Sequence, residues 1–184
     1  MKIMSLVKKV WRSMRLKSGW ASITSCDVLV VRHDADCGFS FNSAAYSPII
    51  DSIVEYCRLK NKSVQSIATP FSSLTGRLAF NNPVAFNRSF LIIAIMSKLL
   101  TVFVGRERSV DWRIAKECII WRKILKRVKP SLIIGIQPAL SLCRSSKPLG
   151  IPVYDIQHGV ITAEHWWYGK QLKDIVAATD LPSG

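Results

Sequence analysis

The chain has 184 residues, of which 26 are Lys or Arg and 12 are Asp or Glu, so its formal net charge is +14. Hydrophobic residues make up 49% of the sequence, which is enough to bury a core and excludes a disordered basic tail. The length suits one domain or half of a two-domain enzyme. A charge this positive predicts an anionic partner, which is nucleic acid, an acidic lipid surface or a phosphorylated small molecule.

Residues 1–20 have the pattern of a basic amphipathic helix, and we assign residues 1–26 to this N-terminal segment. Apolar residues recur at three- and four-residue spacing, and basic residues occupy the other side. Such a helix can lie in the interface of an anionic membrane with its Trp near the lipid headgroups. The alternative is an ordinary surface helix packed on its own domain. The residues predicted to face the membrane are Trp11, Lys8, Lys9, Arg12 and Arg15.

The next part of the chain alternates strand and helix patterns. DVLVVR (27–32) is typical of a strand buried on both faces, and the polar residues 33–43 follow as a loop. Residues 44–61 have helical spacing, with Pro48 in the first turn of the helix. VQSIA (64–68) predicts a second strand.

The middle of the chain predicts a loop followed by two helices. Residues 71–88 are rich in Ser, Asn, Gly and Pro and predict a loop over a shorter element. Residues 88–104 predict a strongly apolar helix, which is shorter than the roughly 20 residues needed to cross a bilayer and which we expect to be mostly buried. Residues 111–128 predict an amphipathic helix with Asp111 as its N-cap, ended by Pro130.

The last segments predict a strand at 131–137, a short helix at 138–150 and a strand at 151–157. Strand, helix and strand with tight connections form a βαβ unit, which makes the strands parallel and the crossover right-handed. The predicted fold class is therefore α/β, a Rossmann-like parallel sheet with helices on both faces, over residues 27–180. In such a sheet the ligand binds at the carboxyl ends of the strands.

Two predicted strand ends carry polar residues. His33 and Asp34 follow the first strand, and Gln157, His158 and Gly159 follow the last. Glycine allows a tight turn, and an imidazole can act as acid, base or phosphate partner near neutral pH. His158 is thus the candidate catalytic residue; the alternative is a turn whose imidazole bonds a backbone carbonyl.

Further candidate substrate-binding residues lie close by in the sequence. Gln137, at the end of the preceding predicted strand, is expected to point toward the same crevice as His158. Glu164 and His165 precede three successive aromatic residues, 166–168, which either stack on a sugar or a base or cap the core beside the site.

Several common motifs and spacings are missing from the sequence. GxGxxG, GxxxxGK[ST], GxSxG and HExxH do not occur, which disfavours dinucleotide-dependent oxidoreductases, P-loop NTPases, α/β-hydrolases and zincins. The five cysteines never form a CxxC spacing, which favours reduced cytoplasmic thiols, and we expect neither a metal nor a cofactor. The basic residues are concentrated in the N-terminal segment and in residues 111–128, which disfavours nucleic acid as the partner.

The segment GIPVYDIQHGVIT (150–162) resembles a strand and loop of bacterial surface-polysaccharide glycosyltransferases with the GT-B architecture, of the capsule or O-antigen kind. YSPIIDSIVE (46–55) is similar to a helix found early in such proteins, and related His-Gly loops occur in UDP-sugar 2-epimerases. The resemblance implies a nucleotide-sugar donor and a glycan or lipid-linked acceptor. It also implies that Gln157, His158 and Gly159 line the cleft, with His158 as base or phosphate ligand.

Glycosyltransferases of this architecture place most donor contacts in a second Rossmann domain, which this chain lacks. The resemblance therefore implies a truncated N-terminal half, with the C-terminal domain encoded beyond it or on a separate chain. The basic N-terminal helix is expected to hold it at the cytoplasmic face of the membrane. Two alternative functions remain open. One is a nucleotide-sugar 2-epimerase-like isomerase that uses His33, Asp34 and Asp36, and the other is a non-catalytic module that binds the membrane surface.

Overall fold

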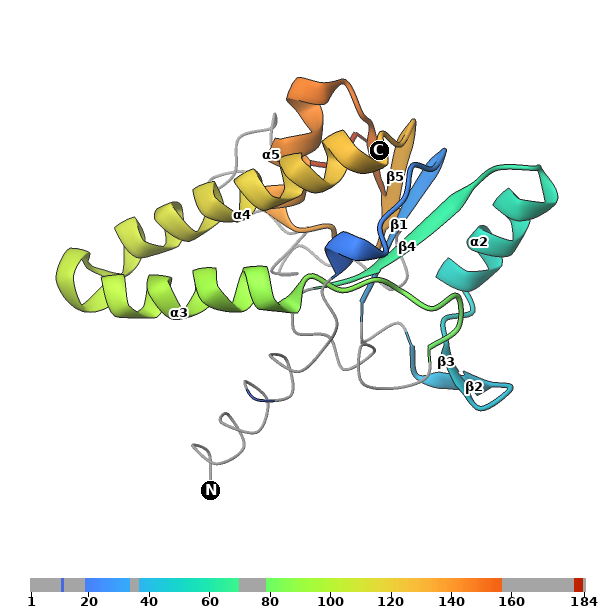
Figure 1. Ribbon diagram of the computed structural model, residues 1–184, viewed down its shortest axis with the longest axis horizontal. Coiled ribbons are helices and arrows are strands. Elements are labelled where there is room, and N and C mark those ends of the chain that lie inside the picture. Colours follow the sequence, from blue (N-terminus) through green and yellow to red (C-terminus); the bar gives the residue numbers. More distant parts are fainter. Residues whose placement is uncertain (1–10, 12–18, 34–36, 70–78, 157–180, 184) are drawn as a thin grey trace, which may run out of the picture.

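The computed structural model describes residue 11 and residues 19–33, 37–69, 79–156 and 181–183. Its main feature is a four-stranded parallel sheet in the order β4-β1-β5-β6, accompanied by a small two-stranded hairpin (Figure 1). The predicted fold class is confirmed, because helices cover both faces of the parallel sheet. The elements in chain order are η1 (Gly19–Ala21), β1 (Val28–Arg32), β2 (Phe39–Phe41), β3 (Ala44–Tyr46), α2 (Ile50–Leu59), β4 (Val64–Ala68), α3 (Asn87–Val104), α4 (Arg106–Val128), β5 (Leu132–Gly135), α5 (Leu140–Ser146), η4 (Lys147–Leu149) and β6 (Val153–Asp155).

The central strand β1 separates two hydrophobic cores. Every residue of β1 is buried, as the sequence predicted for a strand covered on both faces. Successive side chains of a strand point to opposite faces, so Val30 packs with Ile50 and Val54 of α2, whereas Leu29 belongs to the core that contains Trp121 of α4. The core around Trp121 is the larger of the two and also contains residues of α3 and α5.

The order of the strands reverses direction at β1. From β1 the chain passes through α2 to β4 on one side, and it then crosses through α3 and α4 to β5 on the other side of β1. The predicted βαβ unit is confirmed, because β5, α5 and β6 follow with β6 parallel to β5. The point between β1 and β5 is therefore the topological switch point of the sheet, where the connections lead away in opposite directions.

The predicted loop at 33–43 and the early start of the following helix are wrong. The described part of this region contains a β-hairpin, in which Phe41 pairs with Ala44 across a two-residue turn. Asn42 and Ser43 have φ values of 49° and 63°, which is the left-handed backbone that a tight hairpin turn requires. Because residues 44–46 form the second strand of this hairpin, helix α2 begins only at Ile50.

Helices α3 and α4 form an antiparallel hairpin that extends away from the sheet (Figure 1). Gly105, with φ +83°, reverses the chain, so α4 begins at Arg106 and not at the predicted Asp111. The prediction that the apolar helix is mostly buried is also wrong, because only 22% of α3 is buried. Its first turns reach the core, whereas most residues of its outer half are exposed.

Candidate functional site

The carboxyl ends of all four strands lie at one edge of the sheet, because the strands are parallel. In open α/β sheets, ligands bind outside the carboxyl ends of the strands at the switch point. Here that point lies between the ends of β1 and β5, so the residues that follow these two strands define the candidate site.

Gln137 and Asp155 meet at this edge. The backbone N–H of Gln137 donates to Oδ1 of Asp155 at 2.9 Å, which joins the turn after β5 to the last residue of β6. The backbone of Gln137 is left-handed, with φ 49°, and its side chain is half-buried. In addition, the N–H of Ile156 donates to the carbonyl oxygen of Gly135 at 2.8 Å and extends the pairing by one residue. The end of β6 is thus held beside Gln137, at the carboxyl edge of the sheet.

His33 follows β1 directly and is half-buried. Because β1 and β5 are neighbours, His33 and Gln137 stand after the two strands that flank the switch point. Trp11 of the predicted membrane-facing set is 61% exposed. The other candidates lie outside the described residues: Asp34, Asp36, Gln157, His158, Gly159, Glu164 and His165 of the predicted site, and Lys8, Lys9, Arg12 and Arg15 of the N-terminal segment.

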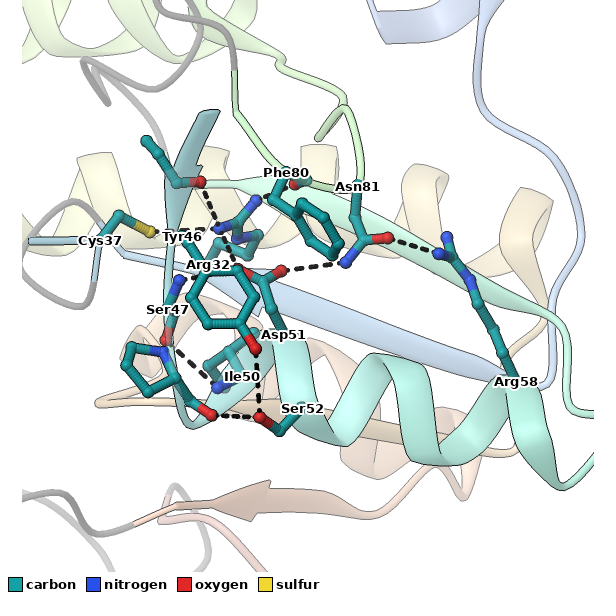
Figure 2. Close-up of polar contacts among 12 residues, drawn as sticks. Arg32, Cys37, Tyr46, Ser47, Ile50, Asp51, Ser52, Arg58, Phe80 and Asn81 are labelled. Carbon is teal, nitrogen blue, oxygen red and sulfur yellow. Dashed lines mark hydrogen bonds and ion pairs between the residues drawn. The ribbon is translucent and has the colours of Figure 1, made fainter. Parts of the chain in front are cut away.

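A buried ion pair lies at the end of β1, next to the site. Nη2 of Arg32 is 2.7 Å from Oδ2 of Asp51 in the first turn of α2, and both side chains are fully inaccessible to solvent (Figure 2). The guanidinium also donates to the carbonyl oxygens of Phe80 and Ala45 and to Sγ of Cys37. Arg32 therefore ties the end of β1 to the β2–β3 hairpin, to α2 and to the segment that precedes α3.

The carboxylate of Asp51 is held from two further directions. Its Oδ2 accepts the backbone N–H of Ser47 at 2.7 Å, and its Oδ1 accepts Nδ2 of Asn81 at 3.0 Å. The amide oxygen of Asn81 in turn accepts a hydrogen bond from Arg58 of α2 (Figure 2). Charge-assisted hydrogen bonds of this kind fix the positions of the groups that they join. The network therefore holds the end of β1, which His33 follows, in one arrangement.

Arg32 and Asp51 were not among the site residues predicted from the sequence. One feature of the sequence could have indicated them: Arg32 ends an otherwise apolar strand, and a buried charge needs a partner of opposite sign. The partner could not be chosen from sequence, because Asp51 is 19 residues away and meets Arg32 only through the packing of α2 on β1.

Of the described groups with shifted pKa values, Glu117 lies close to this edge, because its Oε2 accepts a hydrogen bond from Oγ of Ser141 at 3.0 Å in the first turn of α5. Burial raises the pKa of Glu117 on α4 and raises that of the Cys26 thiol to about 11. Hydrogen bonds from Ser63 lower the pKa of Asp27, which precedes β1 at the opposite edge of the sheet. Within the described ranges, His, Cys, Asp and Glu form no group of three that could hold a metal ion.

Comparison of the chain with protein-family models, with curated proteins and with solved structures finds no match.

Proposed function

We propose that this chain supplies the N-terminal domain of a surface-polysaccharide glycosyltransferase of the GT-B type. The observation that carries the proposal is the arrangement at the carboxyl edge of the sheet, beside the switch point. The ends of β5 and β6 are joined there by the Gln137–Asp155 hydrogen bond, and in the sequence the segment Gln157-His158-Gly159 begins two residues after the end of β6. Strand β6, which precedes this motif in the sequence, thus ends at the edge where α/β sheets bind ligands.

Sugar transfer to a hydroxyl group needs a base for the hydroxyl proton and a group that stabilises the negative charge developing on the departing nucleotide phosphate. In this proposal the imidazole of His158 performs one of these two tasks. Gln137 and His33, which follow β5 and β1, are the proposed hydrogen-bond partners of the sugar or the phosphate. Neither task needs a resident metal.

The proposed partners follow from the same resemblance. They are a nucleotide-sugar donor, a glycan or lipid-linked acceptor, and an anionic membrane surface at the cytoplasmic face that brings the enzyme to its acceptor. The N-terminal segment with Trp11 remains the proposed contact with that surface.

The test is a transfer assay on the complete two-domain enzyme, in which this chain is joined to or accompanied by the proposed C-terminal donor-binding domain. The enzyme is incubated with radiolabelled UDP-glucose, UDP-galactose or UDP-N-acetylglucosamine and with bacterial membranes as the source of acceptor, and label in the lipid-linked and polymer fractions is counted. His158→Ala is expected to reduce incorporation about 100-fold or more, as loss of a general acid or base does. The control is Lys62→Ala, an exposed residue before β4 at the opposite edge of the sheet. Full activity of His158→Ala, or no incorporation by the unmodified protein, contradicts the proposal.

A second candidate function, nucleotide-sugar 2-epimerisation, is favoured by the position of His33 at the switch point. It is tested by the same incubation without membranes, with the configuration of the recovered UDP-sugar as the readout. Epimerisation without any acceptor supports the isomerase, whereas incorporation that depends on acceptor supports the transferase.

A further inference from the structure

The outer surface of the α3–α4 hairpin carries a stripe of exposed apolar side chains on α3. Val102 and Phe103 are 81% and 82% exposed, and Leu99 is 55% exposed. At 100° per residue the stripe covers about 120° of the helix circumference and runs along most of its length. We call these residues the α3 stripe: Ile92, Ile95, Met96, Leu99, Val102 and Phe103.

The face of α3 that meets α4 near the tip is built from small hydroxyl residues. Oγ of Ser97 donates to the backbone oxygen of Ser109 at 3.0 Å, and the hydroxyls of Thr101 and Ser109 are 2.8 Å apart. Ser97 and Ser109 are buried. Small polar residues between the helices and large apolar residues outside are the reverse of the pattern of a water-exposed hairpin. This arrangement is typical of helices that pack together in contact with lipid.

The charge of the hairpin matches an anionic surface. Residues 87–128 contain ten Lys or Arg and three Asp or Glu, a net charge of +7, which is half of the net charge of the whole chain. Exposed basic residues border the stripe, with Lys98 beside it and Arg106 and Arg108 directly after the turn. Basic side chains next to an exposed apolar face are the composition of elements that lie in the interface of acidic membranes.

The hairpin is suited to lie in the interface and not to cross the bilayer. Of the described helices, α3 alone is long and apolar enough for a span, but its first turns are anchored in the core through Phe90 and Leu91. The outer half of α4 carries Glu107, Asp111 and Arg113, whose charges would all have to enter the hydrocarbon in a spanning hairpin.

We propose that the α3–α4 hairpin is a membrane-binding element whose α3 stripe inserts into the interfacial region of a bilayer containing anionic lipid. This surface is formed by other residues than the predicted N-terminal membrane segment, and the proposal does not depend on the catalytic function proposed above. Apolar insertion supplies binding that persists at high salt, and the basic residues supply the preference for acidic lipid.

The test is sedimentation of the full chain with sucrose-loaded vesicles of phosphatidylcholine alone or with 30% phosphatidylglycerol. The variant is Val102→Ser with Phe103→Ser, which changes two side chains that are almost fully exposed and therefore leaves the fold intact. The matched control is Leu59→Ser on α2, which is equally exposed at 81%. We expect the double variant to weaken binding to the anionic vesicles at least about tenfold and the control to bind like the unmodified chain.

Two further measurements distinguish the proposal from membrane binding by the N-terminal segment and from self-association of the chain through the α3 stripe. Deletion of residues 1–18 is expected to leave binding that still depends on Val102 and Phe103; if the deletion abolishes binding and the double variant does not weaken it, the proposal is overturned. Sedimentation velocity tests a second copy of the chain as the occupant of the stripe. A dimer that the double variant converts to monomer, with vesicle binding unchanged, overturns the proposal, as does a chain that binds no vesicles.

Discussion

The buried pair of Arg32 and Asp51 predicts a large and asymmetric response to mutation. Asp51→Asn keeps the shape of the side chain and an oxygen that can accept from Ser47, but it removes the negative charge. The guanidinium of Arg32 would then remain fully buried, with only neutral acceptors, among them the backbone oxygens of Ala45 and Phe80.

The size of the effect follows from this burial. Removing one partner of a buried ion pair costs about 3–5 kcal/mol, because an uncompensated charge stays in the interior. For a chain of this length, such a loss corresponds to a fall in Tm of about 10 °C. If Arg32→Met and Asp51→Leu are combined, both charges disappear. The double variant is therefore expected to be at least about 2 kcal/mol more stable than the sum of the single effects implies.

The assay is urea unfolding followed by circular dichroism for the unmodified chain, Arg32→Met, Asp51→Leu, Asp51→Asn and the double variant. The control is Arg113→Met, which removes a partner of the half-exposed pair of Arg113 and Glu117 at 3.7 Å and should cost less than about 1 kcal/mol. A cost below about 1 kcal/mol for Asp51→Asn, or strict additivity in the double variant, would refute the assignment of the pair as a buried and coupled unit.

Three further predictions concern titratable groups. Because burial raises the pKa of Glu117 in the folded chain, its charged form opposes folding. The Glu117→Gln variant should therefore have a slightly higher melting temperature than the unmodified chain at pH 7, and this difference should disappear below the ordinary pKa of 4.5. Because Ser63 lowers the pKa of Asp27, that carboxylate contributes stability that is present above pH 3.8 and is lost as the pH falls through the folded pKa; Asp27→Asn should lack this acid loss in melts taken across that range. With a pKa of about 11, the thiol of Cys26 should react with a disulfide reagent at pH 8 about two orders of magnitude more slowly than in the unfolded chain. Mass spectrometry of the labelled peptides measures this rate, and labelling of Cys26 as fast as that of half-buried Cys57 would contradict the prediction.

The sheet could be predicted from the sequence because its strands carry their own signals. The β-branched run at 27–32 and VQSIA at 64–68 became β1 and β4 with almost unchanged limits. The end of β5 could also be connected with the end of β6, since parallel strands finish at one edge, and Gln137 does lie beside Asp155.

The parts that could not be predicted depend on contacts between distant segments. The hairpin at Asn42 and Ser43 has strands of only three residues, too short for a periodic pattern, and part of its packing comes from Phe80 across a large sequence distance. The exposure of α3 escaped prediction for another reason. The composition of α3 shows that the helix is apolar, but it does not show how far the helix extends past the sheet and so how much of it can be buried.

The network around Arg32 could be predicted only in outline. A charge at the end of a buried strand implies a buried partner, but the choice among the acidic residues depends on how α2 packs against β1.

The continuity of α4 has a mechanical consequence. Its 23 residues form an uninterrupted helix of about 34 Å that starts at the turn after α3 and ends three residues before β5. Because three residues separate α4 from β5, and because Trp121 and Leu125 pack α4 into the core, a displacement of the outer end of the helix would be transmitted to the start of β5. The number of turns in α4 therefore sets the distance between the tip of the α3–α4 hairpin and the sheet. Inserting or deleting four residues in the outer half of α4, with a matching change in α3, would move that tip by about one turn, about 5 to 6 Å, relative to the sheet.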